Sequence, residues 1–312
     1  MAPVTDVEAV AAGLAAEDYL ADEGLATAVF LALRLERPLL LEGDAGVGKT
    51  EVARALSRWT GGPLVRLQCH EGIDVAQALY EWDHARQLLH LRAVEAAGAS
   101  AGVDALERDL YDERFLLRRP LLTALDGRAG APRPVLLVDE VDRADDEFEA
   151  FLLELLAEWA VTVPELGTVR AKVAPIAVLT SNRTRDLHDA LKRRCLYHWV
   201  EHPDIDREVA IVALRAPEVP ESLAREVAAA AAAIRSLGLY KPPGVAETID
   251  WARALAALGR TALDEHTAAA TLGAIVKHRE DGDRVRAHGL ARVVAGTGNG
   301  AGTAVPAADG GG

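Results

Sequence analysis

The chain has 312 residues, with 48 acidic and 34 basic side chains, a formal net charge of -14 and 4% aromatic residues. This length permits two modest domains and a sizeable core. Binding nucleic acid by neutralising phosphates needs a basic surface with stacking aromatics, so we expect no nucleic-acid partner. The two cysteines, Cys69 and Cys195, are too few for a disulfide framework.

The N-terminal sequence MAPVTDVEAV lacks the basic and apolar regions of a signal peptide. No apolar stretch approaches the ~20 residues of a membrane-spanning helix, because Arg34, Glu36 and Arg37 interrupt the best candidate. We therefore expect a cytoplasmic protein without a transmembrane segment. Peripheral association with the inner membrane stays open.

From the N-terminus to about Pro203, apolar strand-like runs alternate with helical patterns, which is typical of a parallel sheet with helices on both faces. We expect strands near residues 39–42, 64–68, 135–138, 176–180 and 196–200. The predicted fold class is α/β, with a three-layer domain around a parallel sheet followed by a small helical domain.

A phosphate-binding loop follows the first of these strands, at a sequence that fits the pattern G-x-x-x-x-G-K-[ST]. Its glycines allow several backbone N–H groups to point at one anion, and the next helix begins with a dipole that favours negative charge. We expect the lysine to reach the β and γ phosphates of ATP and the threonine hydroxyl to bind Mg²⁺. The candidate ATP-binding residues are Gly43, Asp44, Ala45, Gly46, Val47, Gly48, Lys49, Thr50 and Glu51.

An acidic pair, Asp139 and Glu140, ends the apolar run at residues 135–138. The carboxyl ends of strands are where α/β sheets bind ligands. In a nucleotide-hydrolysing protein the first carboxylate holds Mg²⁺ and the second polarises the attacking water, so we assign these roles to Asp139 and Glu140. The alternative, a solvated acidic turn, loses weight because the phosphate-binding loop is present.

A helix is expected to follow, opened by a capping box formed by Asp146 and Glu149. Residues 161–173 then predict a β-hairpin with its turn at residues 164–167. After the strand at 176–180, Asn182 would lie beside the acidic pair if the two strands are neighbours, and could hold the attacking water. Ordinary turn chemistry is the alternative for this asparagine.

Basic residues, including Arg193 and Arg194, end a short helix before the strand at 196–200. They either complement a helix dipole or supply an arginine finger to a neighbouring subunit. Cys195, His198 and His202, and the pair Cys69 and His70, invite a metal interpretation. We favour packing, since two cysteines do not make a usual zinc site. The metal-binding candidates are therefore Thr50 and Asp139 alone.

Beyond Pro203 the strand signal fades, and alanine-rich helices are expected at residues 205–215, 222–237, 245–258 and 264–279, with Gly238 and Gly259 as helix stops. We place domain boundaries at 1–204, 205–290 and 291–312. The last of these is mostly glycine and alanine, so we expect it to be disordered.

Together, the loop, Asp139-Glu140, Asn182 and Arg194 resemble the active-site set of the AAA+ ATPases. The hairpin and the long segment at residues 71–122 resemble two insertions of the MoxR group. Stretches such as LQCHEGIDVAQALYEW, LKRRCLYHW and GVAETIDWA are similar to its CoxD-type members, over about residues 17–280.

This resemblance implies a hexameric, chaperone-like motor that helps to mature the copper and molybdenum site of a molybdenum hydroxylase, carbon monoxide dehydrogenase. It also implies a von Willebrand factor A partner protein. On this basis Arg194 is preferred over Arg193 as the arginine finger. Many relatives carry an arginine at the start of a lid helix where this chain has Ala246, and Arg253 is a weak substitute.

Two other functions stay open at the level of sequence. One is a DNA-directed motor subunit of a restriction-type system, which the acidic charge balance does not favour. The other is a module that uses ATP only to fix its assembly and hydrolyses little of it.

Overall fold

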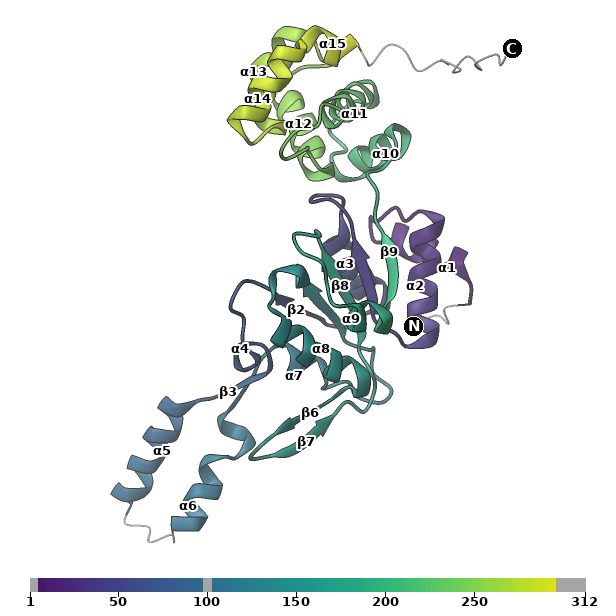
Figure 1. The fold of residues 1–312 in the computed structure, drawn as a ribbon. Coiled ribbons are helices and arrows are strands. Elements are labelled where there is room, and N and C mark those ends of the chain that lie inside the picture. The colour runs from purple at the N-terminus through teal and green to yellow at the C-terminus, as the bar shows by residue number, and fades with distance from the viewer. Residues whose placement is uncertain (1–4, 98–102, 296–312) are drawn as a thin grey trace, which may run out of the picture. The chain divides into compact units, whose positions relative to one another are not determined.

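The computed structural model describes residues 5–97 and 103–295. The chain divides into two compact units, Met1–Glu201 and His202–Gly312. The first contains all the strands of the described chain, and the second is helical (Figure 1). In the described part of the chain, no helix combines the length and apolarity that crossing a bilayer requires.

A five-stranded parallel sheet organises the first unit, in the order β2-β5-β8-β1-β9. This sheet confirms the predicted α/β class, and each expected strand is present within one residue of its predicted ends. The strands are β1 (Leu39–Glu42), β2 (Leu64–Gln68), β5 (Val135–Asp139), β8 (Ile176–Ser181) and β9 (Leu196–Trp199).

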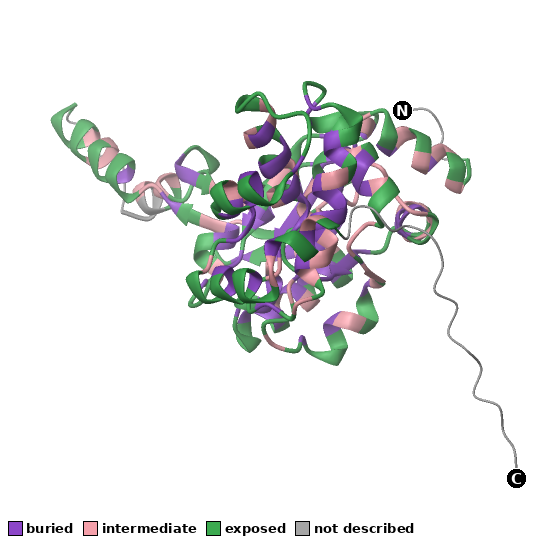
Figure 2. Cartoon of the chain, turned by 90° about the horizontal axis from the view of Figure 1, so that it is seen from above, coloured by how far each residue is buried: buried purple, intermediate pink, exposed green. Residues whose placement is uncertain are grey.

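Helices cover both faces of this sheet, because its central strands are apolar on both sides. Leu39, Leu41 and Leu137 pack on one side against α1 (Val7–Ala15), α2 (Glu23–Leu35) and α3 (Lys49–Thr60). The opposite side packs against α7 (Pro120–Ala124), α8 (Asp146–Glu158) and α9 (Asp189–Arg194). Buried residues, purple in Figure 2, accordingly lie on the strands and on the inward sides of the helices.

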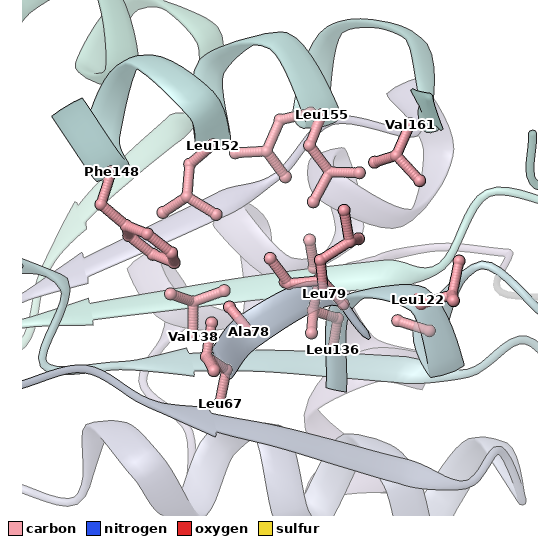
Figure 3. Close-up of a cluster of buried hydrophobic side chains, with 14 of the residues drawn as sticks. Leu67, Ala78, Leu79, Leu122, Leu136, Val138, Phe148, Leu152, Leu155 and Val161 are labelled. Atoms are coloured by element: carbon pink, nitrogen blue, oxygen red, sulfur yellow. The ribbon is translucent and has the colours of Figure 1, made fainter. Parts of the chain in front are cut away.

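The helix α8 packs against the sheet through one apolar face. Phe148, Leu152 and Leu155 point toward Leu136 and Val138 of the sheet (Figure 3). The predicted capping box is wrong by one residue: Asp145 is the N-cap, and its carboxylate accepts the N–H of Phe148 at 2.9 Å. Two aspartates stand in succession here, and spacing alone does not decide between them.

Glu149, the other half of the expected box, is buried and has a different role. Its carboxylate accepts the backbone N–H of His188 at 2.9 Å and pairs with the guanidinium of Arg185. It therefore ties α8 to the segment that leads into α9.

Two inserted segments extend from the five-stranded sheet. Between β2 and β5 the chain forms α4 (Val75–Leu79), α5 (His84–Ala96), α6 (Val103–Leu110), the 3-10 turn η1 (Glu113–Phe115) and the antiparallel pair β3 (Tyr80–Trp82) and β4 (Leu116–Arg118). Between α8 and β8 lies the hairpin of β6 (Ala160–Val163) and β7 (Gly167–Arg170). A second 3-10 turn, η2 (Val141–Arg143), follows β5.

The second unit is a bundle whose core includes the fully buried Trp251. Glycines 238 and 259 adopt positive φ just past two helix ends, as predicted. Its helices are α10 (Ile205–Arg215), α11 (Glu221–Arg235), α12 (Val245–Ala257), α13 (Glu265–Ile275), α14 (Arg279–His288) and α15 (Leu290–Ala295).

The last predicted helix, residues 264–279, is divided in the structure. The ammonium of Lys277 donates to the carbonyls of Gly273 and Ala274, which caps α13, and a new helix begins at Arg279. The predicted tail boundary at residue 291 falls inside α15, and residues 296–312 lie outside the described chain.

A buried ion pair joins three parts of this bundle. Glu208 on α10 is fully buried, and its carboxylate accepts from the guanidinium of Arg235 on α11 at 2.5 and 2.8 Å. The same guanidinium donates to the carbonyl of Pro243 and the hydroxyl of Thr248. All three guanidinium nitrogens of Arg235 thus donate hydrogen bonds that join α10, α11, α12 and the segment before α12.

Glu208→Ala should lower the free energy of local unfolding in this unit by about 3–5 kcal/mol, because it leaves the Arg235 charge buried without its partner. Hydrogen–deuterium exchange of peptides from α10, α11 and α12 measures this change. Glu221→Ala is the control, since its carboxylate is exposed and lies 3.9 Å from Arg225; it should cost less than about 0.5 kcal/mol. Equal effects of the two substitutions would contradict the assignment.

Candidate functional site

The carboxyl edge of the sheet gathers most of the residues predicted to form the site. β8 pairs with both β5 and β1, so the three strands end side by side. The phosphate-binding loop follows β1, Asp139 ends β5, and Asn182 follows β8. The strand that precedes Asn182 therefore neighbours the strand that carries the acidic pair, as the prediction for Asn182 required.

Glycines permit the tight path of the loop at residues 43–50. A Cβ on Gly43 would lie 2.3 Å from the carbonyl oxygen of Val200, so the close approach of these segments requires glycine. Gly46 and Gly48 have φ of 81° and 95°, in the left-handed region that favours glycine. Val47 is buried, whereas Asp44 and Ala45 are exposed at the tip.

Lys49 begins α3 and is the charged group beneath this loop. Only 6% of it is exposed, and its ammonium donates to the carbonyls of Gly43 at 2.7 Å and Asp44 at 2.6 Å. Burial lowers the pKa of Lys49, and nearby carboxylates, Asp142 first among them, partly oppose this. A desolvated ammonium of this kind is suited to an anionic ligand.

Glu51, the last residue of the predicted ATP-binding set, is engaged elsewhere. Its carboxylate pairs with Arg58 at 3.1 Å and Arg54 at 3.5 Å, and its backbone N–H donates to the carbonyl of Gly48. The structure therefore places its side chain along α3 and not over the loop.

Asp139 is the centre of a hydrogen-bond network at this edge. One carboxylate oxygen, Oδ1, accepts from the hydroxyl of Thr50 at 2.9 Å and from that of Thr180 at 2.6 Å. The predicted metal candidates Thr50 and Asp139 are thus in direct contact. The other oxygen, Oδ2, accepts from the guanidinium of Arg66 on β2, a residue that the sequence analysis did not single out.

Glu140 leaves the strand in a strained conformation. Its φ of 54° and ψ of 51° are unusual for a residue with a side chain, and such strain is often found at functional sites. Its N–H donates to the hydroxyl of Thr180 at 2.9 Å, and its carboxylate lies 3.3 Å from the guanidinium of Arg143. Thr180 therefore links the two members of the acidic pair.

Asp142 is a second residue that the sequence analysis missed. It is buried, and its Oδ2 accepts from the N–H groups of Asn182 and Thr184 and from the Thr184 hydroxyl. It thereby fixes the turn that carries Asn182. Its other oxygen makes no hydrogen bond within the described residues. The only sequence signal was its place three residues after Asp139.

Arg193 and Arg194 are not brought to this edge. They end α9 directly before β9, at the amino edge of the parallel sheet, where the N–H of Leu196 donates to the carbonyl of Pro38. A four-residue strand spans about 13 Å, so their own Asp139 lies across the sheet. Both side chains are exposed, and neither has an ion pair or side-chain hydrogen bond within the described residues.

Arg37, which the sequence analysis read only as a charge in an apolar stretch, holds the end of α9. Its guanidinium donates to the carbonyls of Arg193 at 2.6 Å, Arg194 at 3.0 and 3.2 Å, and Cys195 at 3.3 Å. These bonds satisfy carbonyls that a helix end leaves unpaired. The backbone that carries the two exposed arginines is fixed as a result.

Ala246 and Arg253, the two positions that the sequence analysis compared with a lid arginine, both lie on α12 of the helical unit. Ala246 is exposed in the first turn of α12. Arg253 donates to the carbonyl of Arg215 and pairs with Glu218 at 3.4 Å, so its guanidinium is already used inside this unit.

The donor set at the carboxyl edge fits Mg²⁺, which prefers hard oxygen ligands and takes few of them from the protein when substrate phosphates supply others. A threonine hydroxyl and one carboxylate match this pattern. Among the described residues, no three histidine, cysteine, aspartate or glutamate side chains form a metal-binding cluster. Burial raises the pKa of the Cys69 and Cys195 thiols to about 12, which disfavours the thiolate that a metal needs.

Comparison with known proteins agrees with this arrangement. The chain is 46% identical to midasin of Giardia intestinalis over 48 residues, a match that covers 15% of this chain and 1% of that protein. Residues 38–195, which include every candidate site residue, match the AAA domain (dynein-related subfamily). The chain therefore belongs to this family of AAA domains.

Proposed function

We propose that the chain is an Mg²⁺-dependent ATPase that works in a ring, and that its insertions and sequence stretches make it a MoxR-type chaperone. One observation carries the ATPase part: the hydroxyl of Thr50 lies 2.9 Å from Asp139 Oδ1, beside the buried Lys49. These three groups meet where parallel sheets bind ligands. Membership of the AAA domain family supports the same conclusion.

Each residue at this edge has a task in that reaction. Lys49 and the loop amides bind the phosphates of ATP, and Thr50 and Asp139 hold Mg²⁺, which supplies charge neutralisation when bound. Glu140 polarises the attacking water. Asn182, on a turn fixed by Asp142, holds that water in place.

Arg194 completes the site of a neighbouring chain. Its place at the amino edge keeps it from its own Asp139, and its exposure leaves it available to another subunit. An arginine supplied in trans stabilises charge on the transferring phosphoryl group. We infer a closed homo-oligomer, with a hexamer as the expected size.

The client role rests on the likeness to MoxR proteins of the CoxD type. It assigns the chain to maturation of the metal site of a molybdenum hydroxylase, with a von Willebrand factor A protein as partner. The hairpin of β6 and β7, whose turn contains the exposed Glu165, is our candidate for the surface that touches the client. The acidic charge balance supports a protein client over DNA.

Glu140→Gln should bind ATP in the presence of Mg²⁺ and release almost no phosphate, because it keeps the shape of the side chain and loses the carboxylate that polarises water. Fluorescent-nucleotide binding and steady-state phosphate release measure the two properties. Lys49→Ala is the matched comparison and should lose binding as well. A wild-type protein that binds ATP without turnover would support an assembly module instead.

The Glu140→Gln protein, trapped with Mg-ATP and recovered from native cells, also tests the client role. Co-purification of a von Willebrand factor A protein and molybdenum-hydroxylase subunits would support it. Recovery of nuclease subunits or DNA would replace it with the restriction-type motor and leave the ATPase proposal intact.

Arg194→Ala should leave nucleotide affinity nearly unchanged while lowering turnover about a thousandfold, since a trans arginine acts on the transition state. Arg193→Ala removes the same charge from the adjacent exposed position and should retain most turnover. Binding and phosphate release are measured on both variants at concentrations where the wild-type protein is assembled. A greater loss of binding than of turnover in Arg194→Ala would contradict the assignment.

A further inference from the structure

Asp139 has a positive partner in addition to its two hydroxyl donors. The guanidinium of Arg66 donates to Oδ2 from Nε at 3.1 Å and from Nη2 at 2.6 Å. The Asp139 side chain is 5% exposed, so this guanidinium neutralises a buried negative charge.

The register of the sheet explains how Arg66 reaches this position. Gln68 on β2 lies opposite Asp139, and Arg66 lies opposite Leu137, two residues earlier on the same side of the sheet. Nη2 of Arg66 also donates to the side-chain oxygen of Gln68, which directs the guanidinium toward the carboxyl edge. Gln68 therefore helps to hold the arginine against Asp139.

Arg66 and a divalent cation are both positively charged and would both bind the carboxylate of Asp139. A cation bound to Asp139 would bring two positive charges close to the guanidinium, and like charges at such short range repel strongly. The side chain of Arg66 is 44% exposed on β2, an outer strand of the sheet, so it can withdraw toward solvent without uncovering a core. Oδ1 would keep its bonds from Thr50 and Thr180.

We propose that Arg66 competes with Mg²⁺ for Asp139, so that the metal binds weakly by itself and well only together with the negative charge of a nucleotide. This inference rests on the proposed ATPase site. It makes Arg66 a positioning residue that governs the order of loading: nucleotide phosphates first offset the guanidinium, and the carboxylate then becomes available to the metal.

The test uses Mn²⁺ as the probe and the full chain, with free Mn²⁺ followed by electron paramagnetic resonance. Without nucleotide, Arg66→Gln should bind Mn²⁺ about tenfold more tightly than the wild-type protein, the size expected for loss of one partly exposed charge. With saturating ADP the two proteins should differ less in Mn²⁺ affinity, because the ADP phosphates offset the charge of Arg66 in the wild-type protein. Arg118→Gln is the control, because it breaks an Arg–Asp pair of 2.7 Å, with Asp126, outside the site; it should leave Mn²⁺ affinity unchanged.

Arg66→Met provides a second variant should glutamine disturb folding, and circular dichroism melting reports whether each variant is folded. Unchanged or weaker Mn²⁺ binding by a folded Arg66 variant would overturn the inference and assign the arginine a purely structural part. Failure of the wild-type protein to bind fluorescent ADP with Mg²⁺ would instead contradict the ATPase proposal, so the two failures are distinguishable.

Discussion

The parallel pairing of β8 with β5 on one side and β1 on the other is the constraint on which the candidate site depends. Because parallel strands end at a common edge, three segments far apart in sequence deliver their next residues to one place. The strand pairing alone brings the loop, the acidic pair and Asn182 to the same edge of the sheet. The helices on both faces supply the burial that keeps this edge in register.

The charged side chains at the carboxyl edge are stabilised by hydrogen bonds and ion pairs with neighbouring groups. Lys49 is bonded to carbonyls of its own loop, and Asp139 is shared by two threonine hydroxyls and a guanidinium. Buried charges left without such partners would be costly. Lys49 and Asp139 thus have partners without a ligand, and binding to them must exchange these bonds for new ones.

Much of this could be predicted from the sequence, because the strands are short apolar runs bounded by turn residues and the phosphate-binding loop has a fixed spacing. What sequence could not show were contacts made across strands. Arg66 reaches Asp139 because of the register between β2 and β5, and Arg37 donates hydrogen bonds to the end of α9. Neither arginine belongs to a local sequence motif. The capping residue of α8 was misplaced for a different reason, since two adjacent aspartates satisfy the same pattern.

The arginines at the amino edge and the acceptor groups at the carboxyl edge give the chain two unlike surfaces. An assembly in which one surface of a chain meets the other surface of the next is heterologous, and it closes only as a cycle. The proposed ring would therefore have a direction, since each subunit would offer its arginines to one neighbour and receive those of the other. In that ring, the hydrogen bonds from Arg37 to the end of α9 would set the backbone from which the arginines reach the neighbouring site.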